Sequence, residues 1–152
     1  MMLVHSDQSR GFSLVELMAV IAVISLLLIV AYPSYQGYVK DNRRTEAQSA
    51  LSGFAAAMER HFSNNNTYLG AGPSGADTGA PAIYPDEAPL DSQTKYYDLT
   101  IHAATISTYT LRATPKGTQV GDGFLELLST TQRRWDKNDD GTIGVGEYDW
   151  QK

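Results

Sequence analysis

The chain has 152 residues, a formal net charge of −5 and no cysteine. The acidic balance argues against broad electrostatic binding of nucleic acid, and the lack of cysteine excludes a disulfide, a c-type haem attachment and a thiol nucleophile.

The N-terminal region contains an apolar segment that carries a single acid near its start. From Leu14 to Tyr32 there are 19 residues, and Glu16 is the only charged one. At about 1.5 Å per helical residue this segment is about 28 Å long, close to the thickness of a bilayer core. A charged side chain at bilayer depth costs about 2.5–3.5 kcal/mol on insertion scales. An acid in this apolar segment therefore indicates a functional site, in which Glu16 has a binding partner.

A secretory signal peptide is the first alternative for this region. A signal peptide places its small residues after the apolar core, whereas here Gly11 precedes the core. Cleavage at Gly11 would therefore leave the apolar segment on the mature chain. An ordinary single-pass anchor explains the segment but gives Gly11 and Glu16 no role.

The sequence from Gly11 to Glu16, GFSLVE, followed by an apolar helix, resembles the class III leader site of type IV pilins and type II secretion pseudopilins. The resemblance implies that a prepilin peptidase removes the leader, residues 1–11, and methylates the new N-terminal Phe12. It also implies that Glu16 is the assembly glutamate. Because residues four apart share a helix face, Glu16 is placed to neutralise the amine of Phe12 in its own chain or in a neighbouring subunit.

The resemblance continues with Pro33-Ser34-Tyr35 and Tyr38, where the mature pilin helix bends and leaves the membrane. Residues 12–33 are then a transmembrane and assembly helix. The expected location is the inner membrane, as a single-pass precursor, and afterwards the cell-surface pilus. The expected partners are other pilins, the prepilin peptidase, the inner-membrane assembly machinery and, before assembly, membrane lipid, whereas nucleic acid is not expected.

Apolar residues at helical spacing predict an amphipathic helix over residues 34–63, continuing past Pro33 with a kink. They are Ala47, Leu51, Phe54, Ala55, Met58 and Phe62. One face is expected to pack on a sheet and the other to face solvent or neighbouring subunits. Asn64-Asn65-Asn66 ends the pattern, because asparagine tolerates the left-handed conformation that closes a helix.

Residues 64–94 are expected to form a connecting loop. Its prolines exclude a long regular element; they are Pro73, Pro81, Pro85 and Pro89. In pilins the corresponding αβ-loop is a variable surface used between subunits. The loop also contains a literal GxGxxG at residues 70–75, but no predicted strand precedes it and no helix follows, so it does not predict a dinucleotide site.

Three segments rich in Tyr, Thr, Leu and Ile, with alternating polarity, predict strands at Tyr96–Ala103, Thr108–Thr114 and Gly123–Ser129. Short links between them favour an antiparallel meander over residues 95–130. The first two segments resemble PilE-type minor pilins. The predicted fold class is therefore α+β, the type IV pilin fold, with a long N-terminal helix packed on a small antiparallel sheet.

The C-terminal region, residues 131–152, corresponds by the resemblance to the D-region that many pilins close with a disulfide. Residues 136–147 match the D-x-[DN]-x-[DN]-G-x5-E calcium loop. Its candidate oxygen ligands are the side chains of Asp136, Asn138, Asp140 and Glu147 and the carbonyl of Thr142. The paired helices of an EF-hand are not predicted, and a solvated acidic turn is the alternative. We expect a bound Ca²⁺ to hold this region closed in place of a disulfide.

No catalytic motif is found, and the three histidines lie in the leader, the helix and a strand, so we do not expect an enzyme. The leading hypothesis is a minor type IV pilin, a structural subunit that enters or primes a pilus. The alternatives are a type II secretion pseudopilin, a membrane-anchored calcium-binding module, and a tip subunit that recognises a surface or DNA through the αβ-loop.

Overall fold

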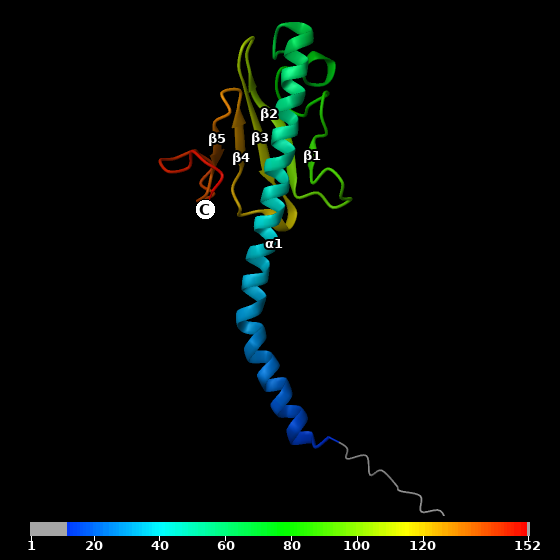
Figure 1. Cartoon of the computed structure of the whole chain (residues 1–152), viewed down its shortest axis with the longest axis vertical. Coiled ribbons are helices and arrows are strands. Elements are labelled where there is room, and N and C mark those ends of the chain that lie inside the picture. The colour runs from blue at the N-terminus through cyan, green and yellow to red at the C-terminus, as the bar shows by residue number, and fades with distance from the viewer. Residues whose placement is uncertain (1–11, 152) are drawn as a thin grey trace, which may run out of the picture. The chain divides into compact units, whose positions relative to one another are not determined.

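The computed structural model describes residues 12–151, which form one long helix, five strands and two short 3-10 helices (Figure 1). Along the chain the elements are α1 (Leu14–Asn65), η1 (Pro73–Gly75), β1 (Glu87–Ala88), β2 (Tyr97–Ala104), β3 (Tyr109–Pro115), η2 (Gly117–Gln119), β4 (Leu125–Leu128) and β5 (Arg133–Trp135). The chain divides into two units, Met1–Tyr38 and Val39–Lys152.

The described part of the first unit is the N-terminal half of α1. This half contains a stretch that is long and apolar enough to cross a membrane. Its apolar side chains are exposed, for example Leu14, Ile29 and Val30, each at least 70 %. The helix continues through Pro33 without interruption. The exposed apolar surface predicts that lipid or other protein chains cover this half of the helix.

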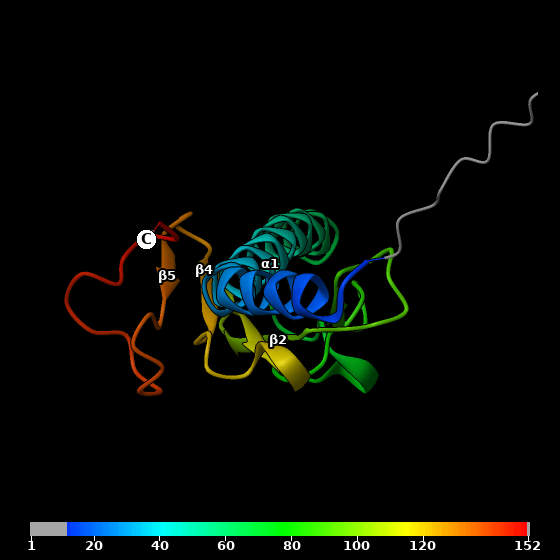
Figure 2. The same ribbon diagram turned by 90° about the horizontal axis from the view of Figure 1, so that it is seen from below.

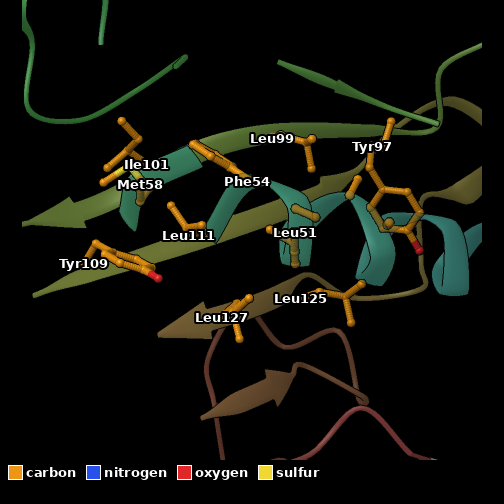
Figure 3. Close-up of a cluster of buried hydrophobic side chains, with 14 of the residues drawn as sticks. Leu51, Phe54, Met58, Tyr97, Leu99, Ile101, Tyr109, Leu111, Leu125 and Leu127 are labelled. Atoms are coloured by element: carbon orange, nitrogen blue, oxygen red, sulfur yellow. The ribbon is translucent and has the colours of Figure 1, made fainter. Parts of the chain in front are cut away.

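In the second unit the remainder of α1 packs on one face of the antiparallel sheet, whose strand order is β1-β2-β3-β4-β5. Leu51, Phe54 and Met58 lie three and four residues apart, so they share one helix face, and all three are fully buried. Alternate residues of the strands meet them, and Figure 3 shows both sets in one cluster. The strand residues labelled there are Tyr97, Leu99, Ile101, Tyr109, Leu111, Leu125 and Leu127. The α+β pilin architecture expected from the sequence is confirmed.

The end of α1 follows the asparagine run. Asn66 adopts a φ of 54°, and its N–H donates to the carbonyl of Phe62 at 2.7 Å. Asparagine is one of the few residues that adopt this left-handed conformation readily, so the run stops the helix at Asn65.

The sheet has two short edge strands that the sequence did not predict. β1, two residues long, pairs antiparallel with β2 from within the αβ-loop. β5, three residues long, pairs with β4 from within the C-terminal region. Strands of two or three residues are too short to show the alternation of polar and apolar residues by which a strand is predicted, and β1 is followed directly by a proline, which argues against a strand. The central strands β2, β3 and β4 form the expected meander, with ends shifted by one or two residues.

The αβ-loop packs against the helix and the sheet of the domain. The ring of Tyr84 stacks on Phe54 with centroids 5.3 Å apart, and Gly79 forms a bridge with Ile101 of β2. The GxGxxG sequence at residues 70–75 forms part of a turn closed by a hydrogen bond from the N–H of Gly72 to the carbonyl of Ala76, 2.7 Å long. Nothing in this geometry resembles a strand-to-helix dinucleotide site.

Replacement of Phe54 by alanine tests the core. Phe54 is fully buried between the sheet and Tyr84, so Phe54→Ala is expected to lower the free energy of unfolding by roughly 3–5 kcal/mol. Denaturant unfolding of the full chain in detergent measures the change. The matched variant Ser52→Ala, at an exposed position of the same helix, is expected to change it by less than about 0.5 kcal/mol. Equal effects of the two variants would contradict this core.

Candidate functional site

The N-terminal site consists of Gly11, Phe12 and Glu16. Gly11 lies outside the described residues. Phe12 is 81 % exposed and precedes α1, and Glu16 lies in the first turn of the helix. The structure therefore places Glu16, the candidate assembly acid, at the beginning of the apolar helix.

Two effects of different size act on Glu16. An acid in the first turn of a helix is stabilised by the helix dipole by about 0.3–1 kcal/mol. The dipole therefore stabilises Glu16 only modestly at this position. On insertion scales a charge costs about 2.5–3.5 kcal/mol at the centre of a spanning helix, and Glu16 lies near one end of its apolar stretch. The helix dipole and a positively charged partner would both lower the free energy of the charged side chain there.

In the uncleaved chain Phe12 lies before the helix. The helix starts at Leu14, and a hydrogen bond runs from the N–H of Leu17 to the carbonyl of Ser13, 3.1 Å long. The pairing of Glu16 with the amine of Phe12, in its own chain or in a neighbouring subunit, concerns the cleaved chain and stays a prediction.

The second candidate site is the C-terminal segment from Asp136 onward, drawn in orange to red beside β5 (Figures 1 and 2). It lies at the opposite edge of the sheet from β1 (Figure 1). Asp136 is 1 % exposed and Glu147 is 7 % exposed. Among residues 12–151 neither carboxylate forms an ion pair with Lys, Arg or His.

Backbone N–H groups satisfy these two carboxylates. Asp136 accepts from the N–H groups of Asp140 and Gly141 at 3.0 and 2.9 Å. Glu147 accepts from Lys137 at 2.9 Å and from Gly144 at 2.7 Å, one on each of its oxygens. The two acids thus hold the beginning and the end of the loop together.

The other candidate ligands lie at the surface. Asp140 accepts hydrogen bonds from the hydroxyl and the N–H of Thr142 at 2.7 and 2.8 Å, which hold the pKa of Asp140 below its ordinary value. Asn138 donates to the other oxygen of Asp140 at 2.8 Å. Among the described residues no three His, Cys, Asp or Glu side chains lie close enough together to hold a metal ion. Closure around an ion would require Glu147 to leave its backbone donors.

Sequence reasoning missed the part that Trp150 plays in closing this region. Its indole N–H donates to the carbonyls of Arg134 and Glu126 at 3.0 and 3.2 Å, and its own carbonyl accepts from Gln48 of α1 at 3.3 Å. The N–H of Trp135 donates to the carbonyl of Glu147 at 3.0 Å. These contacts fasten the C-terminal segment to α1 and β5. A lone tryptophan near the end of the chain was the only signal in the sequence.

The two described histidines have separate structural partners. His61 bonds to the carbonyl of Leu69 at 2.9 Å, and His102 bonds to the guanidinium of Arg112 at 3.0 Å. Neither contact provides a nucleophile or a base for one.

These features define a class: a subunit with an exposed apolar N-terminal helix, an acid in its first turn, and a helix-on-sheet domain. The comparisons with known proteins agree with it. The prokaryotic N-terminal methylation motif matches residues 7–32, and the family described as "Type IV minor pilin ComP, DNA uptake sequence receptor" matches residues 33–123.

Individual relatives are also named as fimbrial or pilin proteins. The chain is 33% identical to the fimbrial protein EcpC of Eikenella corrodens over 142 residues, which is 93% of this chain and 80% of that protein. It is 34% identical to the type IV major pilin protein PilE1 of Neisseria gonorrhoeae over 49% of this chain and 35% of that protein. The crystal structure of the Neisseria meningitidis non-core minor pilin PilV matches with a TM-score of 0.48 and 17% identity, covering 76% of this chain and 98% of that chain.

The chain belongs to the type IV pilin family, and within it to the minor pilins. Its family is one of structural pilus subunits, and its apolar N-terminal helix and prepilin motif make it a membrane-anchored pilus protein.

Proposed function

We propose that this minor pilin is made as a single-pass inner-membrane precursor, is cut after Gly11 and methylated at Phe12 by a prepilin peptidase, and is then inserted into a type IV pilus through α1. The observation that carries the proposal is the lone acid, Glu16, in the first turn of an otherwise apolar helix. Its partners are then other pilins, the peptidase, the inner-membrane assembly machinery and, before assembly, lipid.

The role of Glu16 follows from its two environments. In the bilayer its charge is unpaired and costly. In the filament an opposite charge at the exposed α-amine of a neighbouring Phe12 removes much of that cost, because an ion pair is strong where water is excluded. The pairing therefore favours transfer of the subunit from lipid to filament and sets its position along the filament axis.

Replacement of Glu16 by alanine tests the proposal. Glu16→Ala is expected to insert and to be processed normally, because it removes a charge from an otherwise apolar membrane helix, but to be absent from filaments. Immunoblots of membrane and sheared-pilus fractions measure both steps.

The matched control is Glu46→Ala, which removes an exposed acid of the same helix and is expected to enter filaments normally. Incorporation of Glu16→Ala at the normal level would contradict the role of this acid.

We further propose that the loop from Asp136 to Glu147 takes up Ca²⁺. The support is the donor set, which is made of oxygen atoms as calcium prefers, and the burial of two carboxylates that have no cationic partner among residues 12–151. Asp136, Asn138, Asp140 and Glu147 would supply side-chain oxygens and Thr142 its carbonyl. A bound cation would supply the charge that balances the two buried acids.

Calcium titration of the full chain in detergent tests this second proposal. Binding to the folded state is expected to stabilise it by about 2.7 kcal/mol when the free Ca²⁺ concentration is a hundred times Kd, seen as a higher melting temperature and as heat in calorimetry. Glu147→Ala is expected to abolish the difference between calcium and chelator. Asp149→Ala, which removes an exposed acid outside the motif, is expected to keep it. Absence of heat and of any shift in the native chain would contradict the proposal.

DNA reception is described for the matched family, but the charge of this domain does not support it here. Residues 39–151 contain ten Lys and Arg against fifteen Asp and Glu. Arg112 and Arg134 contact the buried Glu126, and Lys116 contacts Glu87 and Asp98. Cations that are already paired release fewer counterions from a phosphate backbone, so they contribute little to binding.

A further inference from the structure

A buried ion pair joins α1 to the connection between β3 and β4. The Nε of Arg44 donates to Oδ2 of Asp122 at 2.9 Å, and a second guanidinium nitrogen donates to Oδ1, so the pair is bidentate. Each residue is only 7 % exposed. The guanidinium also lies over the ring of Trp135, 3.9 Å from its centroid. Burial by itself lowers the pKa of Arg44, but Asp122 outweighs it and holds the pKa above its ordinary value.

Three neutral groups complete the network around Asp122. The hydroxyl of Tyr97 donates to its carboxylate at 2.7 Å, and the amide of Gln119 donates to the same carboxylate at 2.9 Å. The same Gln119 amide reaches the helix carbonyl of Lys40 at 3.0 Å, and the indole of Trp135 donates to the carbonyl of Asp122 at 2.7 Å. Burial and the hydrogen bond to Asp122 raise the pKa of the Tyr97 hydroxyl, which therefore stays protonated.

Two longer side chains extend the contact to the surface. The Nζ of Lys40 donates to the carbonyl of Val120 at 3.3 Å, and Arg43 donates to the hydroxyl of Thr118 at 3.0 Å. Together with the buried pair they tie a single stretch of α1, little more than one turn, to the β3–β4 connection. We call this set the register clasp. It consists of Lys40, Arg43, Arg44, Tyr97, Thr118, Gln119, Val120 and Asp122.

The clasp contains a buried ion pair between α1 and the rest of the domain. Further along α1 the contacts with the sheet are mainly apolar, through residues such as Leu51 and Phe54, and the Tyr109 hydroxyl donates to Glu59 at 3.0 Å. A buried charge pair tolerates only a narrow geometry, whereas the apolar contacts depend mainly on area. A shift of one helical turn, about 5.4 Å, would leave Arg44 and Asp122 as buried, unpaired charges, which is strongly destabilising.

We infer that the register clasp fixes the position of the sheet along α1 and supplies a large part of the resistance to axial sliding when the helix is pulled toward its N-terminus. The direction of the load rests on the proposed function, in which α1 is held in the filament while the domain lies outside it. The clasp itself rests only on contacts within residues 39–151.

Pulling experiments on the full chain in detergent test the inference. The native chain has no cysteine, so introduced cysteines are unique handles. Gln36→Cys with Ser107→Cys loads α1 against the far turn of the β2–β3 hairpin, along the helix. Gln93→Cys with Thr130→Cys loads the sheet without pulling on α1. The lifetime of the folded state at constant force is measured in both geometries.

The test variant replaces the buried polar network by apolar residues. It combines Arg44→Met, Tyr97→Phe, Gln119→Met and Asp122→Leu. Such replacements often leave thermal stability unchanged or raised, so the variant separates register from stability. Under axial load its lifetime is expected to fall about tenfold, the change that a loss of about 1.4 kcal/mol from the barrier produces. Under load applied to the sheet alone its lifetime is expected to stay at the native value.

Two further variants keep the test decisive. Arg44→Lys preserves the charge but loses the bidentate geometry, and it is expected to shorten the axial lifetime even if the apolar variant does not fold. The matched control, Arg112→Met with Glu126→Leu and Arg134→Met, removes a network of ion pairs within the sheet and is expected to leave the axial lifetime unchanged.

An unchanged axial lifetime in the folded test variants would overturn the inference, as would an equal loss in both pulling geometries, which indicates a general loss of stability. Filament incorporation is not read in this experiment. A negative result here therefore leaves the proposal for Glu16 intact, and a failure of the Glu16 proposal leaves the clasp intact.

Discussion

One helix of 52 residues must satisfy two different environments, and the rest of the structure depends on this constraint. Its second half is covered by the sheet of its own chain, but its first half exposes a continuous apolar surface. Such a surface is stable only in lipid or against other apolar helices. Under the proposed function the single acid at its start makes lipid and filament unequal as coverings, because a neighbouring subunit with a free amine would supply an opposite charge and lipid would not. That difference would favour transfer of the subunit from the membrane to a filament.

The domain at the other end of this helix has to stay closed without a disulfide. Three kinds of contact do so. The apolar cluster of Figure 3 holds the helix on the sheet, the Arg44–Asp122 pair fixes the β3–β4 connection on α1, and Trp150 with Glu147 fastens the C-terminal segment to α1 and β5. The apolar cluster buries most of the surface. The ion pair and the contacts of Trp150 and Glu147 fix how the segments are oriented, since charged and hydrogen-bonded groups tolerate only a narrow geometry.

The features that were predictable from the sequence are local or periodic ones. Glu16 is conspicuous because its neighbours are uniformly apolar, the helical spacing of Leu51, Phe54 and Met58 indicates the buried face, and the asparagine run indicates the end of α1. The edge strands β1 and β5 were not predictable, because two or three residues show no period. The Arg44–Asp122 pair was hidden for another reason: its members are 78 residues apart, and only the fold brings them together. The helix begins at Leu14, two residues later than the predicted helix over residues 12–33, and the partner of Glu16 stays a prediction.

The central claim is that a new α-amine is made at Phe12 and meets Glu16 of a neighbouring subunit. Mass spectrometry of the N-terminal peptide from purified pili tests it most directly. The account predicts a chain that begins at Phe12 and carries one added methyl group. Subunits in pili that retain residues 1–11 would contradict it, because Glu16 would then have no amine at Phe12 to pair with.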